Sequence, residues 1–241
     1  MRLSLSTRPG SFVPPGSGVT LAGQAYELIK RDLFEFRMLP GDDFTESDLV
    51  TRLGVSRTPV RQALYRLERE GFVQLRQRSG WRVRPFDFER FEALYDVRIV
   101  LEQASVTRLC SLHDMDGTGE LSTLKHIWLV PAAERLRSGR QVAELDEAFH
   151  CALVAAAGNP EMSQIHREVT EKIRIIRQLD FTKDYRVDAT YVEHGAILRA
   201  ILARRTDEAT RMLKSHIEIS KSEVRRITLH RLQAARREGL G

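Results

Sequence analysis

Two helix-forming segments joined at a single glycine constrain the fold of this chain more than any other feature. A short helix capped by Thr45, with acidic residues in its first turn, is predicted to end at Gly54. A second helix, capped by Ser56 or Thr58, carries a proline in its first turn, where the missing N–H costs no hydrogen bond, and stops at Gly71. Two helices separated by so tight a turn favour a helix-turn-helix unit.

The segments on either side complete this unit. Residues 21–36 have the apolar spacing of a helix, which ends at a Pro-Gly pair. Residues 72–75 and 81–83 are short extended runs with a polar, glycine-containing loop between them, which predicts a hairpin. The order of helix, helix, glycine turn, helix and hairpin predicts a winged helix-turn-helix over residues 19–85.

The rest of the chain has a different composition. Residues 1–18 are rich in proline, glycine and serine without a hydrophobic block, so we expect a flexible tail rather than a signal peptide. After the hairpin, helical patterns follow one another with no strand pattern between them, which predicts an all-α helical bundle over residues 86–236. The predicted helices span residues 88–112, 120–128, 142–157, 161–179, 187–203 and 207–236. The predicted fold class is therefore mainly α.

The sequence also indicates where the protein works. No apolar stretch approaches the roughly 20 residues of a membrane span, so we expect no membrane partner. The two cysteines, Cys110 and Cys151, lie in helical segments. We expect reduced thiols and a cytoplasmic protein.

Positive charge is concentrated in one part of the chain. Residues 52–84 contain nine arginines and only two glutamates, whereas residues 19–51 contain three basic and seven acidic residues. So local a basic block is typical of a surface that binds phosphate groups. The alternative is a solvated basic face without a partner.

The first turn of the second helix is where a protein of this fold would read DNA. A recognition helix enters the major groove by its N-terminal turn, which here carries Arg57, Thr58 and Arg61. Arginine can donate two hydrogen bonds to one guanine, and neither arginine has an obvious acidic neighbour in the sequence. Arginines later on the helix, such as Arg66, can instead balance Glu70.

Four motifs in this region resemble the GntR family of bacterial regulators. They are LPG at residues 39–41, ESDL at 46–49, LGVSRTPVRQAL at 53–64 and EGFV at 70–73. The resemblance implies that double-stranded DNA is a partner. The DNA-contacting residues that it implies are Ser47, Arg57, Thr58 and Arg61, with Gln77 and Arg78 at the tip of the wing.

In the second half of the chain, four polar side chains fall on apolar helix faces. Asp146 and His150 are four residues apart and share one such face, and His194 and His216 lie on two others. An unsatisfied imidazole or carboxylate in apolar packing is costly. One carboxylate and three imidazoles suit a divalent metal, so convergence of the four would form a metal site. The alternative for each histidine alone is a hydrogen-bonded core residue.

The remaining histidines show weaker patterns. His126 and His230 fall on polar faces, and His113 sits near a helix end, where it can bond terminal carbonyls. His166 lies at an apolar edge, and its role stays open.

Motifs around the four polar residues resemble the FCD effector domain of FadR-type GntR regulators. They are DEAFH at residues 146–150, AAGN at 156–159, EHGAI at 193–197 and MLKSH at 212–216. Metal-binding members of that group use an aspartate and three histidines at these positions, and acyl-CoA-binding relatives lack the set. The resemblance implies a divalent ion, Zn²⁺ first and Ni²⁺, Mn²⁺ or Fe²⁺ otherwise. The implied ligands are Asp146, His150, His194 and His216.

Arg98 is the candidate effector-binding residue. It lies four residues before Glu102 on a mostly apolar helix face, and the pair matches the family pattern. Arg98 could bind the carboxylate of an effector whose other end coordinates the metal. The alternative is a simple ion pair between Arg98 and Glu102 within the helix.

The resemblance implies a homodimeric transcription regulator on a palindromic operator, which we expect to be a repressor released by a small carboxylate. No nucleophile or general base accompanies the four polar residues, so we do not expect an enzyme. Two alternatives stay open: a metal-dependent enzyme fused to a DNA-binding domain, and a DNA-binding protein with a purely structural metal.

Overall fold

The computed structural model describes residues 20–77, 80–112, 119–181, 184–224 and 226. These residues divide into two compact units, one ending at Asp87 and the other running from Phe88 to Arg226. The tail predicted at residues 1–18 and the predicted limit at residue 236 lie outside the described residues.

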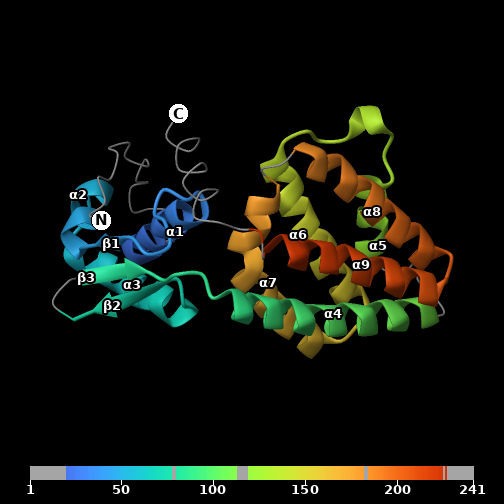
Figure 1. The fold of residues 1–241 in the computed structure, drawn as a ribbon, viewed down its shortest axis with the longest axis horizontal. Coiled ribbons are helices and arrows are strands. Elements are labelled where there is room, and N and C mark those ends of the chain that lie inside the picture. Colours follow the sequence, from blue (N-terminus) through green and yellow to red (C-terminus); the bar gives the residue numbers. More distant parts are fainter. Residues whose placement is uncertain (1–19, 78–79, 113–118, 182–183, 225, 227–241) are drawn as a thin grey trace. The chain divides into compact units, whose positions relative to one another are not determined.

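The first unit combines three helices with a small antiparallel sheet (Figure 1). Its helices are α1 (Leu21–Phe34), α2 (Glu46–Leu53) and α3 (Arg57–Glu70). Its strands are β1 (Asp43–Phe44), β2 (Val73–Arg76) and β3 (Gly80–Val83), in the order β1-β3-β2. Helix α1 packs against α3, and Ile29, Leu64 and Leu67 on these helices are fully buried. The unit is the predicted winged helix-turn-helix.

Local signals place α2 and α3 where the sequence predicts them. The N–H of Asp48 donates to Oγ1 of Thr45 over 3.2 Å, and the N–H of Thr45 donates to the Asp48 carboxylate over 2.8 Å. This reciprocal cap starts α2. Gly54 ends it in the left-handed region with φ 66°, where a glycine carries no steric cost. Of the two predicted caps of α3, Ser56 occupies the capping position, without a side-chain hydrogen bond.

Strand β1 is an element that the sequence did not predict. It pairs with β3 so that Asp43 lies opposite Arg82, and Phe44 opposite Trp81. The Arg82 guanidinium donates to both Asp43 carboxylate oxygens, at 2.7 and 2.6 Å. A two-residue strand is too short to show an alternating pattern, so only this charge pair could have indicated it.

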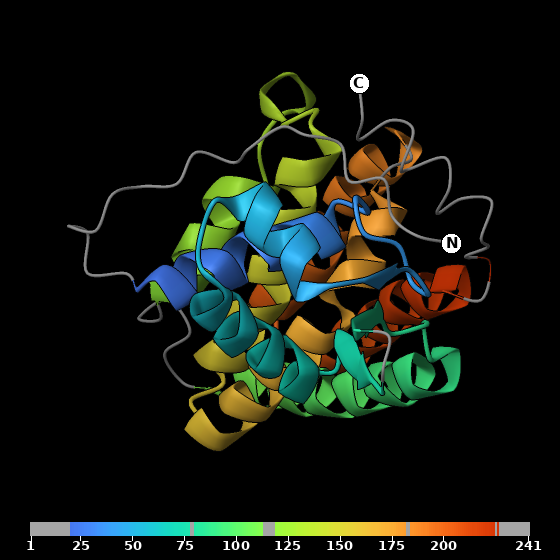
Figure 2. The same ribbon diagram turned by 90° about the vertical axis from the view of Figure 1, so that its left-hand side faces the viewer.

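The second unit is a bundle of helices, and its described residues contain no strand. The helices are α4 (Phe88–Ser111), α5 (Gly119–Trp128), α6 (Gly139–Ala156), α7 (Pro160–Asp180), α8 (Asp184–Leu202) and α9 (Thr206–Val224), with a short 3₁₀ turn at Ala132–Glu134. Helix α9 lies along α4 in both views (Figures 1 and 2). Helix α6 contacts α4, α5, α7 and α8, so its residues occupy the centre of the bundle. The predicted fold class is confirmed.

Two further expectations can be compared with the described residues. Cys110 and Cys151 are both free thiols, as expected. Within the described ranges, no helix is both long and apolar enough to cross a membrane.

Candidate functional site

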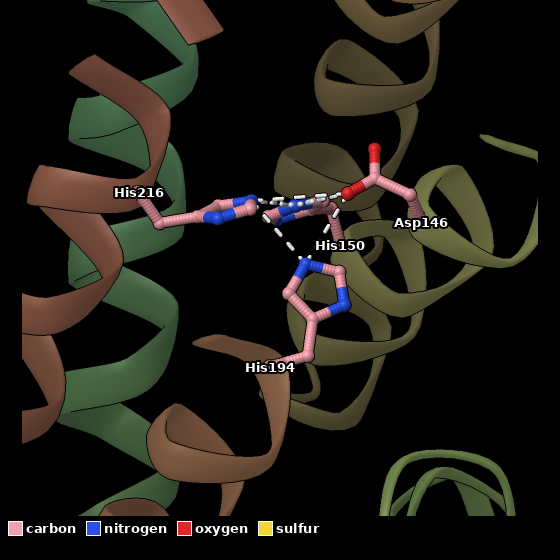
Figure 3. A group of neighbouring side chains, drawn as sticks. All are labelled: Asp146, His150, His194 and His216. Atoms are coloured by element: carbon pink, nitrogen blue, oxygen red, sulfur yellow. Dashed lines mark hydrogen bonds and ion pairs between the residues drawn. The ribbon is translucent and has the colours of Figure 1, made fainter. Parts of the chain in front are cut away.

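Four buried side chains from three helices point toward one another in the centre of the bundle (Figure 3). Asp146 and His150 come from α6, His194 from α8 and His216 from α9. One ligand atom from each lies within 4.8 Å of the others. The structure therefore brings together all four residues that the sequence singled out as metal ligands.

The distances between these atoms define the shape of the cluster. Nε2 of His194 lies 3.2 Å from Oδ1 of Asp146 and 3.2 Å from Nε2 of His216. Nε2 of His150 lies 3.2 Å from Nε2 of His216 and 3.6 Å from Oδ1 of Asp146. The distance from His216 Nε2 to Asp146 Oδ1 is 3.8 Å.

Two carboxylates outside the cluster fix the orientation of two of its rings. Nδ1 of His150 lies 2.6 Å from Glu102, and Nδ1 of His216 lies 2.6 Å from Glu193. Burial raises the pKa of Glu102, but Arg98 and His150 outweigh it and hold that pKa well below its usual value. Burial acts likewise on Glu193, whose pKa is still lowered, chiefly by the His216 hydrogen bond. Since both carboxylates are ionised, each Nδ1 must carry the proton that it donates.

The imidazoles of His150 and His216 consequently turn lone pairs toward the centre. Burial lowers the pKa of His150 and of His216, and it lowers the pKa of His194 to about 4 although the Asp146 carboxylate beside it acts in the opposite direction. The pKa of Asp146 lies well below its usual range, because Arg177 and the histidines outweigh the effect of burial. A neutral ring protonated on Nδ1 has only a lone pair on Nε2. The lone pairs of His150 and His216 and the ionised carboxylate of Asp146 thus make the cluster an electron-rich centre.

A divalent cation fits this centre. Donor atoms bound to one tetrahedral zinc at their usual bond lengths lie about 3.3 Å apart, close to the 3.2 to 3.8 Å found here. Carboxylates that orient ligating imidazoles are a recurring feature of metal sites. Glu102 and Glu193 hold those positions, although the sequence did not mark either as a site residue. Two features of the sequence could have indicated them: Glu193 directly precedes His194, and Glu102 lies four residues after Arg98.

Aromatic residues close one side of the cluster. The ring of Phe149 stacks on His194, with centroids 3.9 Å apart and planes 12° apart. Trp128 meets the same imidazole edge-on, with centroids 4.2 Å apart. Both aromatic side chains are fully buried. An apolar wall of this kind strengthens the electrostatic interactions of the groups that it encloses.

Arg98 is buried beside the cluster, and Glu102 lies between Arg98 and His150. Its Nε donates to Glu102 over 2.6 Å, so the ion pair considered from the sequence exists. That pair does not use the whole guanidinium, because Nη2 of Arg98 is buried without a hydrogen-bond partner. His166, whose role the sequence left open, is also buried and donates from Nε2 to Glu102 over 2.9 Å.

The other histidines do not join the cluster. His126 is exposed, as its polar helix face predicted, and its Nδ1 lies 2.8 Å from the carbonyl oxygen of Ser122. His113 and His230 lie outside the described residues.

The predicted DNA-contacting residues are exposed at neighbouring ends of α2 and α3. Ser47, Arg57, Thr58 and Arg61 all have exposed side chains. Nη2 of Arg57 lies 3.4 Å from Oγ of Ser47, which joins the two helices at this surface. Gln77 is exposed after β2, while Arg78 lies outside the described residues.

One expectation about this surface is wrong. Arg61 does have an acidic neighbour, because its Nε and Nη2 donate to Glu46 over 2.9 and 2.8 Å. Glu46 lies on α2, 15 residues earlier in the chain, so helical spacing could not reveal the pair. The expectation that Arg66 balances Glu70 is confirmed, since the two side chains form an ion pair at 3.1 Å.

Comparison with known proteins decides the family. Residues 21–83 match the gntR family of bacterial regulatory proteins, and residues 93–219, more than half of the chain, match the FCD domain. The chain belongs to the GntR family. It is a transcriptional regulator with a DNA-binding winged helix-turn-helix and an FCD domain, in a family of regulators rather than enzymes.

Individual relatives agree with this membership. The Nta operon transcriptional regulator of Aminobacter aminovorans is 31% identical over 185 residues, which cover 77% of this chain and 84% of the relative. The HTH-type transcriptional repressor RspR of Escherichia coli is 24% identical over 204 residues, which cover 85% of this chain and 89% of the relative. A solved GntR regulator structure from Rhodococcus covers 86% of this chain and 98% of its own, with a TM-score of 0.65 and 21% identity. That last similarity concerns the fold.

Proposed function

We propose that this GntR regulator is a metal-dependent repressor whose release from DNA is controlled by a small carboxylate. Asp146, His150, His194 and His216 would hold one divalent ion, with Zn²⁺ the best match to the donor atoms. The observation that carries the proposal is the convergence of these four buried side chains on one electron-rich point.

Arg98 provides the second half of the effector site. Its guanidinium is 1% exposed and keeps one nitrogen without a partner. A bound divalent ion would offer a coordination position to a carboxylate oxygen. Arg98 would then bind and orient the rest of the same ligand through its unpaired N–H groups.

The DNA half of the proposal rests on the exposed ends of α2 and α3. Ser47, Arg57, Thr58 and Arg61 would contact an operator, with Gln77 and Arg78 on the wing. A homodimer would place two recognition helices about 34 Å apart on a palindromic site. The Escherichia coli relative RspR is named a transcriptional repressor, which supports the same sign of regulation.

Helix α4 offers a covalent route between the two halves. It carries both Arg98 and Glu102, and it begins at Phe88, five residues after β3 ends at Val83. A ligand that binds Arg98 better in one position of α4 would shift the equilibrium toward that position. Couplings of this kind are typically worth about 1–3 kcal/mol.

Elemental analysis combined with DNA titration tests the proposal. We expect one divalent ion per chain, lost in His150→Ala and His194→Ala but kept in His126→Ala, whose imidazole is exposed. An operator selected from random duplexes should be released by at least one small carboxylic acid. Metal loss without any acid response would favour the structural-metal alternative, and turnover of a bound acid would favour the enzyme. Unchanged metal content in both cluster variants would refute the site.

A further inference from the structure

Three buried arginines surround the cluster of Asp146 and the histidines. Arg98 on α4, Arg177 in the last turn of α7 and Arg186 near the start of α8 are 1%, 4% and 4% exposed. Arginine is almost never this buried unless it is paired. Each of the three contacts a carboxylate that belongs to the cluster or orients one of its rings.

The contacts follow one pattern. Nε of Arg177 lies 3.2 Å from Oδ2 of Asp146, the oxygen that does not face the histidines. Nε of Arg98 lies 2.6 Å from Glu102, which orients His150.

Arg186 contacts a carboxylate that orients another ring of the cluster. Its Nη1 lies 3.6 Å from Glu193, and Glu193 orients His216. Asp146 is thus linked to an arginine directly, and His150 and His216 are each linked to one through the carboxylate that orients the ring.

These carboxylates leave much of the arginines' donor capacity unused. Nη2 of Arg98, both Nη atoms of Arg177 and Nε of Arg186 are buried with no hydrogen-bond partner. Buried donors of charged groups are costly when unsatisfied. Planar guanidinium groups with free N–H edges are well suited to carboxylate ligands. The unused donors therefore indicate an anionic ligand that approaches more than one arginine.

Charge balance indicates how much negative charge that ligand carries. The positive charges of Arg98, Arg177 and Arg186 are cancelled by Asp146, Glu102 and Glu193. Histidines that bind a metal are neutral. A divalent ion would therefore leave two uncompensated positive charges in a buried site, and such charge is strongly unfavourable without a counter-ion.

Space for the second anionic group lies beside Arg177. Arg177 borders a cavity of about 250 Å³, which is also lined by Ala143, Glu144, Glu147 and Arg174. Glu147 lies 3.9 Å from Nη1 of Arg177, but it accepts two shorter hydrogen bonds from Arg174, at 2.8 and 2.6 Å, so Arg174 largely neutralises its charge. Arg177 thus lies between Asp146 and a cavity near the size of small-ligand pockets, about 300 Å³ and upward.

We propose that the effector carries two separate anionic groups, one at the metal centre beside Arg98 and the other held by Arg177 and Arg186. This inference rests on the proposed function and narrows its small carboxylate to a dicarboxylate. Arg177 and Arg186 are nine residues apart, across the connection between α7 and α8. They contribute to ligand binding in addition to Arg98, and they select for the second charge.

A matched series of acids tests this proposal on the zinc-loaded full-length protein. Malonate, succinate and glutarate are compared with their monomethyl esters, which keep the chain length, add one methyl group and lose one charge. The apparent Kd is obtained from the melting-temperature shift. We expect at least one diacid to bind tenfold or more tightly than its half-ester, and we expect the preference to vanish in zinc-free protein.

Two variants connect the preference to the arginines. Arg177→Gln and Arg186→Gln should weaken diacid binding about tenfold and half-ester binding less than twofold. Arg167→Gln, at an exposed position of α7, should change neither. Zinc content is measured in each variant, and Arg186→Lys, which keeps the charge, should retain most of the preference.

The outcomes separate this inference from the proposed function. Equal binding of diacid and half-ester, or equal weakening of both in the glutamine variants, overturns the two-charge effector. If a monocarboxylate still releases the operator, the proposed function survives that result. If no acid of either charge shifts the melting temperature or the operator affinity, both proposals fail.

Discussion

Nδ1 of His150 lies 2.6 Å from Oε2 of Glu102, so one buried carboxylate orients an imidazole of the predicted metal centre. The other oxygen of Glu102 accepts hydrogen bonds from Arg98 and His166, at 2.6 and 2.9 Å. The predicted metal ligand and the predicted effector-binding arginine therefore share one carboxylate. A change at Arg98 would therefore remove one of the partners of the carboxylate that orients His150.

We expect Glu102→Gln to lower zinc affinity by about tenfold to hundredfold, the range typical when a group orienting a metal ligand is lost. The amide keeps the shape of the side chain but removes the negative charge that holds the His150 Nδ1 proton. Competition with a chromogenic chelator measures the affinity. Glu89→Gln, at an exposed position of the same helix, should behave like wild type. Equal affinities in Glu102→Gln and wild type would show that Glu102 does not support the metal.

The zinc-free protein should lose stability as the pH falls from about 7 to 5. Burial lowers the pKa of His194 from 6.5 to about 4, so the unfolded chain takes up this proton first. The contribution of the neutral His194 to the free energy of unfolding is complete above the pKa of the unfolded chain, and it is lost as the pH falls from that value toward the folded pKa. The loss at pH 5 is roughly 2 kcal/mol for His194 alone. Burial lowers the pKa of His150 and His216 as well, and they act in the same direction.

Urea unfolding at pH 7 and pH 5 measures this loss. The non-titrating variant His194→Gln should show a smaller decrease between the two pH values, even if it is less stable at both. An identical pH dependence in variant and wild type would contradict the assignment of the acid sensitivity to this imidazole.

Arg57→Ala and Arg61→Ala should each weaken operator binding by about tenfold to hundredfold, as expected for the loss of one specific base contact. Fluorescence anisotropy with a selected operator measures the affinity. Arg69→Ala, an exposed arginine in the last turn of α3, is the control and should have a small effect. Wild-type affinity in both Arg57→Ala and Arg61→Ala would show that these arginines do not contact the operator.

Glu46→Gln should increase the affinity for DNA of any sequence several-fold. Glu46 accepts two hydrogen bonds from Arg61, and its pKa is lowered mainly by that contact. Arg61 must leave this carboxylate to contact a base or a phosphate, and the variant reduces the cost. Titration of random duplex at two salt concentrations measures the gain. A decrease in affinity would show that Glu46 positions Arg61 for DNA instead of competing with DNA.

Local patterns in the sequence predicted much of the fold and the four cluster residues. Helix caps such as Thr45 and turn glycines such as Gly54 act over a few residues, so they can be read without knowledge of the tertiary structure. The helical period likewise places Asp146 and His150 on one face. The resemblance to FCD domains supplied the expectation that His194 and His216 join them.

Contacts between distant segments were not predictable in this way. Glu46 meets Arg61 across two helices, and β1 pairs with a strand 39 residues away. Arg177 and Arg186 look like ordinary helix-end arginines in the sequence. Their burial becomes visible only when α7 and α8 are packed against the rest of the bundle.

The most direct test of the account is the operator affinity of zinc-loaded protein with and without a carboxylic acid that raises its melting temperature. We predict that the acid weakens operator binding at least tenfold in wild type and has no effect in zinc-free protein or in Arg98→Ala. Equal operator affinity with and without the bound acid would contradict the claim that the metal centre controls DNA binding.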